Sequence, residues 1–221
     1  MRRHIALVHT SFVLVDVLNS LLDRTIPEAR RTHIVEHSIL QDVLDAGGLT
    51  PAVTRRMLGY FMLAEATGAD VIFNACSSVG ETVDIARHVV RIPIVKIDDA
   101  MAEEAVRAGH RIGVIATLKT TLDPTCRLVQ QHADHAGAQV EIVRSLCDGA
   151  FDLLSSGQSE AHDQMVREKL IDLGAQVDVI VLAQASMARV APSLPEGAVT
   201  VPVLSSPESG VRHLRELVDS L

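Results

Sequence analysis

Short apolar runs alternate with longer amphipathic stretches along the whole chain. Short runs of mostly Val, Ile, Leu and Ala predict buried strands, whereas stretches with apolar residues three or four positions apart predict helices. Strands that alternate with helices form parallel sheets covered on both faces by helices, so we expect an α/β fold. The predicted strands cover residues 5–8, 32–36, 71–75, 92–97, 112–116, 139–144, 178–183 and 201–204.

Capping residues predict where several helices begin and end. Thr50 followed by Pro51 has the pattern of an N-cap and a first-turn proline, and Gly68 is typical of a helix end. Residues 78–81 have the spacing of a capping box, which predicts a helix to about residue 88. Asp-Pro at 123–124 predicts another helix start. Further helices are expected over 12–22 and 100–108, from Ser159 and from Pro207.

The two halves of the chain resemble each other, which indicates an internal duplication. Three segments match in the same order at separations of 107, 108 and 109 positions. Asp70 recurs as Asp178, and Pro93 recurs as Pro202. The match therefore extends beyond the shared apolar character of strands, which would be the alternative explanation. The matched pairs are 5–10 with 112–117, 70–78 with 178–186, and 92–95 with 201–204.

The composition of this 221-residue chain excludes several classes of protein. A formal net charge of −8 and a pI of about 5.6 argue against nucleic-acid binding. Aromatic residues make up only 2%, too few for rows of stacking platforms, and 48% hydrophobic residues argue against disorder. No uninterrupted apolar run reaches the length of about 18 residues that a membrane span needs, so we expect no membrane partner.

The cysteine content and the first residues predict a cytoplasmic protein. Three cysteines are too few, and odd in number, for a disulfide framework, which favours a reducing compartment. The apolar run after Arg2 and Arg3 is interrupted by His9 and Asp16 and lacks a small-residue cleavage site, unlike a signal peptide. The cysteines are Cys76, Cys126 and Cys147.

The ten histidines predict no metal centre. Two pairs have helical spacing, but no carboxylate or cysteine completes either set of ligands. The pairs are His33 with His37 and His132 with His135.

Hydroxyl and amide side chains gather in the turns that follow the predicted strands. Right-handed crossovers bring all these turns to the carboxyl edge of a sheet, where α/β proteins bind their ligands. Free N–H groups at helix starts favour anions there, so a carboxylate could be held without a basic cluster. Taken one at a time, these residues could equally serve as helix caps. The candidate substrate-binding residues are Thr10, Ser11, Asn74, Ser77, Ser78, Thr117, Thr120, Thr121, Gln184, Ala185 and Ser186, and the segment after residue 95 joins them.

Cys76 is the candidate catalytic residue. It follows a predicted strand and precedes a predicted helix, and the positive end of a helix favours the thiolate form of cysteine. The alternative is a small buried apolar residue, the usual role of a lone cysteine. Cys126 and Cys147 lie away from the predicted ligand edge, so we interpret them as structural.

The chain resembles the aspartate/glutamate/hydantoin racemase superfamily. The resemblance is carried by residues 73–78 (FNACSS), by 112–117 (IGVIAT) with the threonines that follow, and by 178–183. It implies two similar lobes, each a parallel four-stranded sheet flanked by helices, related by a pseudo-twofold with the substrate between them. It also implies no cofactor, frequent homo-oligomers, and a C-terminal segment that returns to the first lobe. We therefore expect residues 1–98 and 205–221 to form the first lobe and 99–204 the second.

The implied mechanism uses one cysteine from each lobe, acting on opposite sides of the substrate α-carbon. Cys76 matches the first, but the duplication places Gln184 at the second position, and an amide cannot act as an acid or base near neutral pH. We expect an isomerase acting through Cys76 on a small carboxylate or cyclic amide. Single-cysteine relatives suggest a decarboxylase or a cis–trans isomerase of small dicarboxylates, and a two-lobed binding protein without catalysis is the third alternative.

Overall fold

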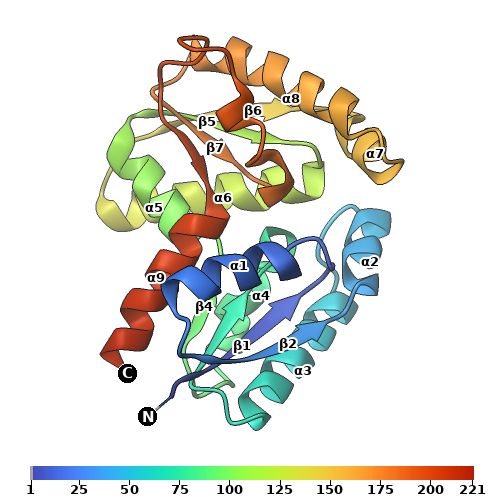
Figure 1. Cartoon of the computed structure of the whole chain (residues 1–221), viewed down its shortest axis with the longest axis vertical. Helices are drawn as coiled ribbons and strands as arrows, with labels where there is room; N and C mark the ends of the chain where they lie inside the picture. Colours follow the sequence, from blue (N-terminus) through green and yellow to red (C-terminus); the bar gives the residue numbers. More distant parts are fainter. Residues whose placement is uncertain (1) are drawn as a thin grey trace. The chain divides into compact units, whose positions relative to one another are not determined.

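The computed structural model describes residues 2–221, which divide into two compact units. The first unit comprises the described residues up to Asp99 together with Pro207–Leu221, and the second comprises Ala100–Ser206. Each unit contains one parallel four-stranded sheet (Figure 1).

The sheet of the first unit has the strand order β2-β1-β3-β4, and all three neighbouring pairs are parallel. Its central strands are buried on both faces, as expected for a parallel sheet between helix layers. The side chains of Ile5 and Leu7 join one core, whereas those of Ala6 and Val8 join the other. The strands are β1 (His4–His9), β2 (Arg30–Val35), β3 (Val71–Asn74) and β4 (Ile94–Lys96).

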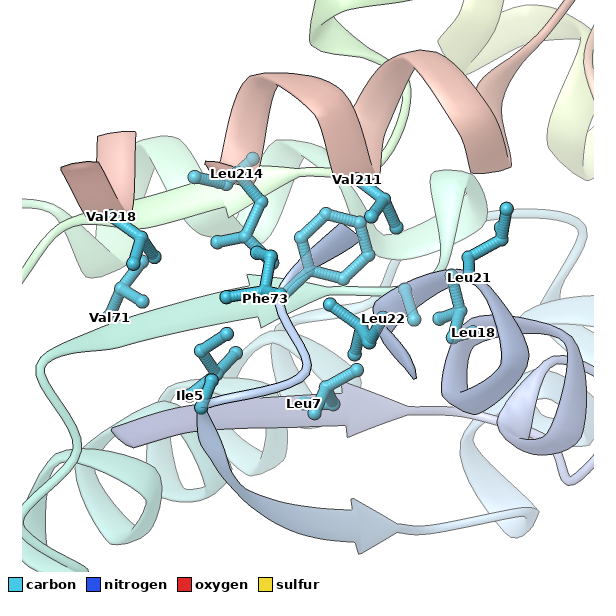
Figure 2. Packing of buried hydrophobic residues seen from close by; sticks show 14 of the residues in the cluster. Ile5, Leu7, Leu18, Leu21, Leu22, Val71, Phe73, Val211, Leu214 and Val218 are labelled. Carbon is cyan, nitrogen blue, oxygen red and sulfur yellow. The ribbon is translucent and has the colours of Figure 1, made fainter. Parts of the chain in front are cut away.

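Helices α1 (Val15–Thr25) and α9 (Ser206–Ser220) cover one face of this sheet. Figure 2 shows Leu22 of α1 and Val211 and Leu214 of α9 near Phe73. The other face is covered by α2 (Ser38–Ala46), α3 (Pro51–Ala66) and α4 (Glu81–Ala86). Both apolar faces of the sheet are therefore removed from water, and α9 supplies part of one of them although it comes from the end of the chain.

Helix α9 approaches the end of β4 closely at Gly210. A Cβ atom at this position would lie well under 3.0 Å from the backbone carbonyl oxygen of Ile97, a separation that real Cβ atoms essentially never show. Glycine is thus required here for helix α9 to pack against the backbone just before Asp98.

The second unit repeats this arrangement with the strand order β6-β5-β7-β8. Helices α5 (Asp99–Ala108) and α6 (Lys119–Ala136) cover one face, and α7 (Ala150–Ser155) and α8 (Ser159–Gly174) cover the other. Helix α5 follows a strand of the first unit but covers the second, just as α9 follows a strand of the second unit but covers the first. The strands are β5 (Arg111–Ala116), β6 (Glu141–Leu146), β7 (Val179–Leu182) and β8 (Val203–Ser205).

The predicted α/β fold with two parallel four-stranded sheets flanked by helices is confirmed. The repeated aspartates have the same structural role in both sheets. Oδ2 of Asp70 accepts the backbone N–H of His4 at the start of β1, at 2.7 Å. Oδ2 of Asp178 accepts the N–H groups of His110 and Arg111 at the start of β5, at 2.9 and 2.8 Å. Each aspartate therefore caps the central strand of its own sheet.

The predicted helix start at Asp123 is wrong. Helix α6 begins at Lys119, after the N-cap Leu118, and Pro124 lies inside it. Proline favours the first turn, where its missing N–H costs nothing, but Pro124 is the sixth residue of this helix, so the proline signal placed the helix start too late. Thr120 and Thr121 consequently belong to the first turn of the helix.

The predicted capping box at Ser78 is also wrong. Ser78 lies in a short 3-10 helix, η1 (Ser77–Val79), and α4 begins only at Glu81 with Gly80 at its N-cap. By contrast, the predicted cap of α3 is confirmed, because Oγ1 of Thr50 accepts the backbone N–H of Val53 at 3.2 Å. Two short helices, α2 and α7, were not predicted, and β6 lies two residues later than expected.

No helix within residues 2–221 is both long enough and apolar enough to cross a membrane.

Candidate active site

The carboxyl edge of the first sheet collects three turns, one after each of β1, β3 and β4. Thr10 and Ser11 follow β1, Cys76 and helix η1 follow β3, and Ile97 and Asp98 follow β4. Because neighbouring strands are parallel, their ends meet at one edge of the sheet.

The Cys76 thiol lies among hydrogen-bond donors in this edge. The residue is partly exposed and extended (φ −143°, ψ 116°), and it directly precedes η1. The hydroxyl of Thr10 and the backbone N–H groups of Ser78 and Val79 hydrogen-bond to its sulfur and stabilise the thiolate. Burial is the larger effect and raises the pKa of the Cys76 thiol above its ordinary value. The sequence-based expectation of a thiolate is thus corrected, because desolvation outweighs the N–H groups.

Asn74 holds the turn that carries Cys76. Its Nδ2 donates to the backbone carbonyl of Cys76 at 3.0 Å, and the whole side chain is buried. Its Oδ1 is buried without a hydrogen-bond partner. A buried amide with one unsatisfied oxygen is costly to a fold, so it is typical of functional sites.

Asp98 is a buried acid at this edge that the sequence analysis did not name. It is 3% exposed, and its Oδ1 has no hydrogen-bond partner. Burial raises the pKa of its carboxyl, while a hydrogen bond with Ser77 opposes the shift. The negative charge of Asp98 in turn raises the pKa of Cys76. The signal that could have found Asp98 was its place in the turn after β4.

We expect Asp98→Asn to lower the pKa of the Cys76 thiol, because the substitution removes a negative charge that opposes ionisation. The measurement is the pH dependence of Cys76 alkylation by iodoacetamide, followed by mass spectrometry. Asp99→Asn is the matched control, because it removes a neighbouring carboxylate that pairs with Arg87, whereas Asp98 is the carboxylate whose charge raises the pKa of the thiol. Identical alkylation profiles for wild type and Asp98→Asn would contradict the expectation.

His9 belongs to a chain of hydrogen bonds behind the first turn. Its Nε2 lies 3.0 Å from Nδ1 of His33, and Nε2 of His33 lies 3.1 Å from Oδ1 of Asn19. Since the amide oxygen only accepts, His33 donates to Asn19, and His9 then donates to His33. Burial, and secondarily the His33 ring, lower the pKa of His9 to about 4. His9 is therefore neutral at pH 7.

Because His9 is buried in its neutral form, we expect the free energy of unfolding to fall on acidification. The pKa of His9 is 6.5 in the unfolded chain and about 4 in the folded one, so between these values only the unfolded chain binds the proton. We expect its contribution, about 3 kcal/mol to the free energy of unfolding, to be complete above pH 6.5 and to be lost as the pH falls to 4. Denaturant unfolding at several pH values measures it. His9→Phe should have the shallower pH dependence, and equal slopes would contradict the prediction.

The second unit has a turn equivalent to that of Cys76. Gln184 follows β7, is extended (φ −132°, ψ 135°) and precedes the 3-10 helix η2 (Ala185–Met187). Its Oε1 accepts the backbone N–H of Thr117 at 2.6 Å and the Thr117 hydroxyl at 3.0 Å. The contact between Thr10 and Cys76 in the first unit therefore recurs between Thr117 and Gln184, with an amide in place of the thiol.

Every predicted site residue lies at or beside the carboxyl edge of its own sheet. Within the first unit the structure brings Thr10, Cys76 and the η1 backbone together, and within the second it joins Thr117 to Gln184. Oγ1 of Thr120 is buried without a partner. The remaining predicted residues occupy the same turns: Ser11, Asn74, Ser77, Ser78, Thr121, Ala185 and Ser186.

The other two cysteines lie in the cores of the second unit, Cys126 beside α5 and Cys147 beside α8. Burial raises the pKa of both thiols. Residues 2–221 contain no group of three or more His, Cys, Asp or Glu arranged to hold a metal ion.

Comparison with known proteins identifies the family of the chain. The sequence model of the Asp/Glu/Hydantoin racemase family matches residues 7–214. The chain belongs to the Asp/Glu/hydantoin racemase family. A search of curated protein sequences found no significant match.

Solved structures share the fold of this racemase-family chain at low sequence identity. Glutamate racemase from Francisella tularensis superposes with a TM-score of 0.77 at 13% identity, covering 99% of this chain and 82% of that one. A putative Asp/Glu racemase from Yersinia pestis gives 0.75 at 16% identity, with 97% and 98% covered. Allantoin racemase from Klebsiella pneumoniae gives 0.72 at 19% identity, with 99% and 88% covered.

Proposed function

We propose that this racemase-family chain is a cofactor-independent isomerase that acts on a small carboxylate or cyclic amide through Cys76. The observation that carries the proposal is the environment of the Cys76 thiol, where the Thr10 hydroxyl and the N–H groups of Ser78 and Val79 surround the sulfur. Its raised pKa keeps the thiol protonated at neutral pH, ready to donate to carbon. The names of the similar structures, glutamate and allantoin racemases, support both substrate classes.

The proposed chemical step is proton transfer between sulfur and the substrate α-carbon. In the forward direction the minor fraction of Cys76 that is thiolate takes the α-proton, and the electron pair of the C–H bond moves into an enediolate. In the reverse direction that electron pair forms a new C–H bond with the thiol proton, and the S–H bond breaks to regenerate the thiolate. The N–H groups of Ser78 and Val79 and the Thr10 hydroxyl stabilise the thiolate in both directions.

Hydroxyl and amide groups at the two sheet edges are proposed to bind the substrate oxygens. Helix starts and uncharged donors suit a single carboxylate in a chain whose net charge is −8. The proposed binding residues are Thr10, Ser11, Asn74, Ser77, Ser78, Thr117, Thr120, Thr121, Gln184, Ala185 and Ser186.

One observation favours a second candidate function. The position equivalent to Cys76 in the second unit carries an amide that neither accepts nor releases a proton near neutral pH. A single thiol suffices to protonate the enediolate left when a substituted malonate loses carbon dioxide. It also suffices for nucleophilic cis–trans isomerisation of a small dicarboxylate. A decarboxylase or cis–trans isomerase is therefore the second candidate.

The test is a substrate panel in D2O with the wild-type chain. Aspartate, glutamate, hydantoins, alkyl- and arylmalonates and maleate are incubated separately and followed by proton NMR, polarimetry and carbon dioxide release. We expect deuterium incorporation at the α-carbon of one class of compound. Incorporation with retained optical activity indicates one-base exchange, whereas loss of optical activity indicates racemisation.

Two other results would replace the proposal. Carbon dioxide release or maleate conversion without α-proton exchange of amino acids would identify the second candidate. Calorimetric binding of panel members without exchange or turnover would identify a binding protein that has no catalytic activity.

A further inference from the structure

Position 184 is the structural equivalent of the catalytic thiol position. Both Cys76 and Gln184 follow the third strand of their sheet, have closely similar backbone angles, and cap a three-residue 3-10 helix. The strand pairing that leads to them is also the same, with Ala75 and Ala183 donating N–H groups to Val8 and Ile115. The chemical difference between the two edges therefore lies in the side chain and not in the backbone.

The orientation of the Gln184 amide is fixed by Thr117. A backbone N–H only donates, so the atom 2.6 Å from the Thr117 nitrogen must be the amide oxygen. The Thr117 hydroxyl, 3.0 Å from the same oxygen, occupies its second acceptor position. The contacts with Thr117 use only the amide oxygen and leave the two N–H bonds of Nε2 uninvolved, and the residue is partly exposed. Gln184 thus offers hydrogen-bond donors only.

An ion pair and two buried side chains hold the turn that carries Gln184 against the rest of the second unit. Arg189 forms a bidentate ion pair with Asp163 of α8, through Nε at 3.0 Å and Nη2 at 2.8 Å. Met187 and Val190 are fully buried in the adjacent core. A donor on an anchored turn binds an acceptor with little loss of conformational freedom.

We propose that the Gln184 Nε2 group is a substrate-orienting donor that selects an oxygen acceptor, either a carboxylate or a ring carbonyl. The proposal rests on the proposed function in taking the ligand to be a small carboxylate or a cyclic amide. A fixed donor excludes an ammonium group from this position, because two sets of N–H bonds would face each other. Gln184 therefore sets which group of the ligand binds at the carboxyl edge of the second sheet.

The test compares Gln184→Met, which keeps the length of the side chain, and Gln184→Glu, which replaces the donor by an acceptor. The probes are succinate for a carboxylate and hydantoin for a ring carbonyl, with dissociation constants measured by calorimetry. We expect Gln184→Met to weaken binding of at least one probe about tenfold or more, and Gln184→Glu to weaken succinate further through charge repulsion. Gln130→Met on the exposed side of α6 is the matched control, and thermal unfolding confirms that each variant is folded.

Folded Gln184 variants that bind both probes as wild type does would overturn this proposal, as would a wild-type chain that binds neither probe. The outcome is separable from that of the substrate panel. Wild-type α-proton exchange with unchanged binding by the variants would reject Gln184 alone. Weakened binding by the variants without exchange by wild type would support Gln184 as a donor and reject the proposed enzymatic activity.

Discussion

Replacing Cys76 by alanine is expected to lower kcat/KM about 10³-fold on the substrate that the panel identifies, because general acid–base groups contribute factors of this order. The variant should fold normally, since Cys76 is partly exposed and only a sulfur atom is removed. Steady-state kinetics and α-proton exchange in D2O measure the effect. The Cys76→Ala variant should still bind the substrate, because the hydroxyl and amide groups that are proposed to bind the substrate oxygens remain in place.

Two further variants test whether the loss of turnover in Cys76→Ala is due to the Cys76 thiol itself. Cys126→Ala removes a thiol from the core beside α5 and should leave turnover unchanged, with a stability cost of about 1 kcal/mol for the small cavity. Cys76→Ser keeps a hydroxyl beside Thr10, but an unactivated serine is a poor acid or base, so it should be nearly as inactive as Cys76→Ala. Turnover within tenfold of wild type in Cys76→Ala would exclude Cys76 as the proton-transferring residue.

The second large effect concerns stability. We expect Gly210→Ala to lower the free energy of unfolding by about 2–3 kcal/mol, because the added methyl group overlaps the Ile97 carbonyl and that backbone cannot rotate away. Either α9 or the end of β4 must shift, and Asp98 follows directly after Ile97. Turnover should therefore fall together with stability. Denaturant unfolding and kinetics on the same preparation measure both quantities.

Gly59→Ala is the control for the glycine substitution, and its expected sign is opposite. Gly59 lies inside α3, and nothing lies within 4 Å of an added Cβ there. Alanine favours a helix over glycine by up to about 1 kcal/mol, so this variant should be slightly more stable than wild type. A Gly210→Ala variant as stable as wild type would show that α9 packs more loosely against Ile97 than described.

Sequence patterns predicted the strands well because parallel strands are short apolar runs bounded by polar turns. The duplication was detectable because both sheets need the same aspartate at the start of their central strand. Helix starts were harder to predict. Pro124 is compatible with several early helix positions, and the spacing of Ser78 and Glu81 fits a capping box although a 3-10 helix intervenes.

The candidate site was predictable as a set of turns but not as a set of contacts. Hydroxyls after strands pointed to Thr10, and the duplication pointed to Gln184, yet neither pattern reveals that a threonine binds each of Cys76 and Gln184. Asp98 escaped detection because acidic residues are usually solvated, and only the fold shows that this one is buried. The pKa of Cys76 likewise depends on burial, which a local motif does not encode.

The exchange of α5 and α9 between the units has a consequence for biosynthesis. The second unit is one continuous stretch, Ala100–Ser206, so it is translated before the residues of α9 that pack on the first unit. The first unit is translated earlier, but the core around Phe73 lacks Val211, Leu214 and Val218 until translation passes them. The part of this sheet face that α9 covers therefore stays uncovered throughout synthesis of the second unit, and uncovered apolar surface makes a partly folded chain prone to aggregation.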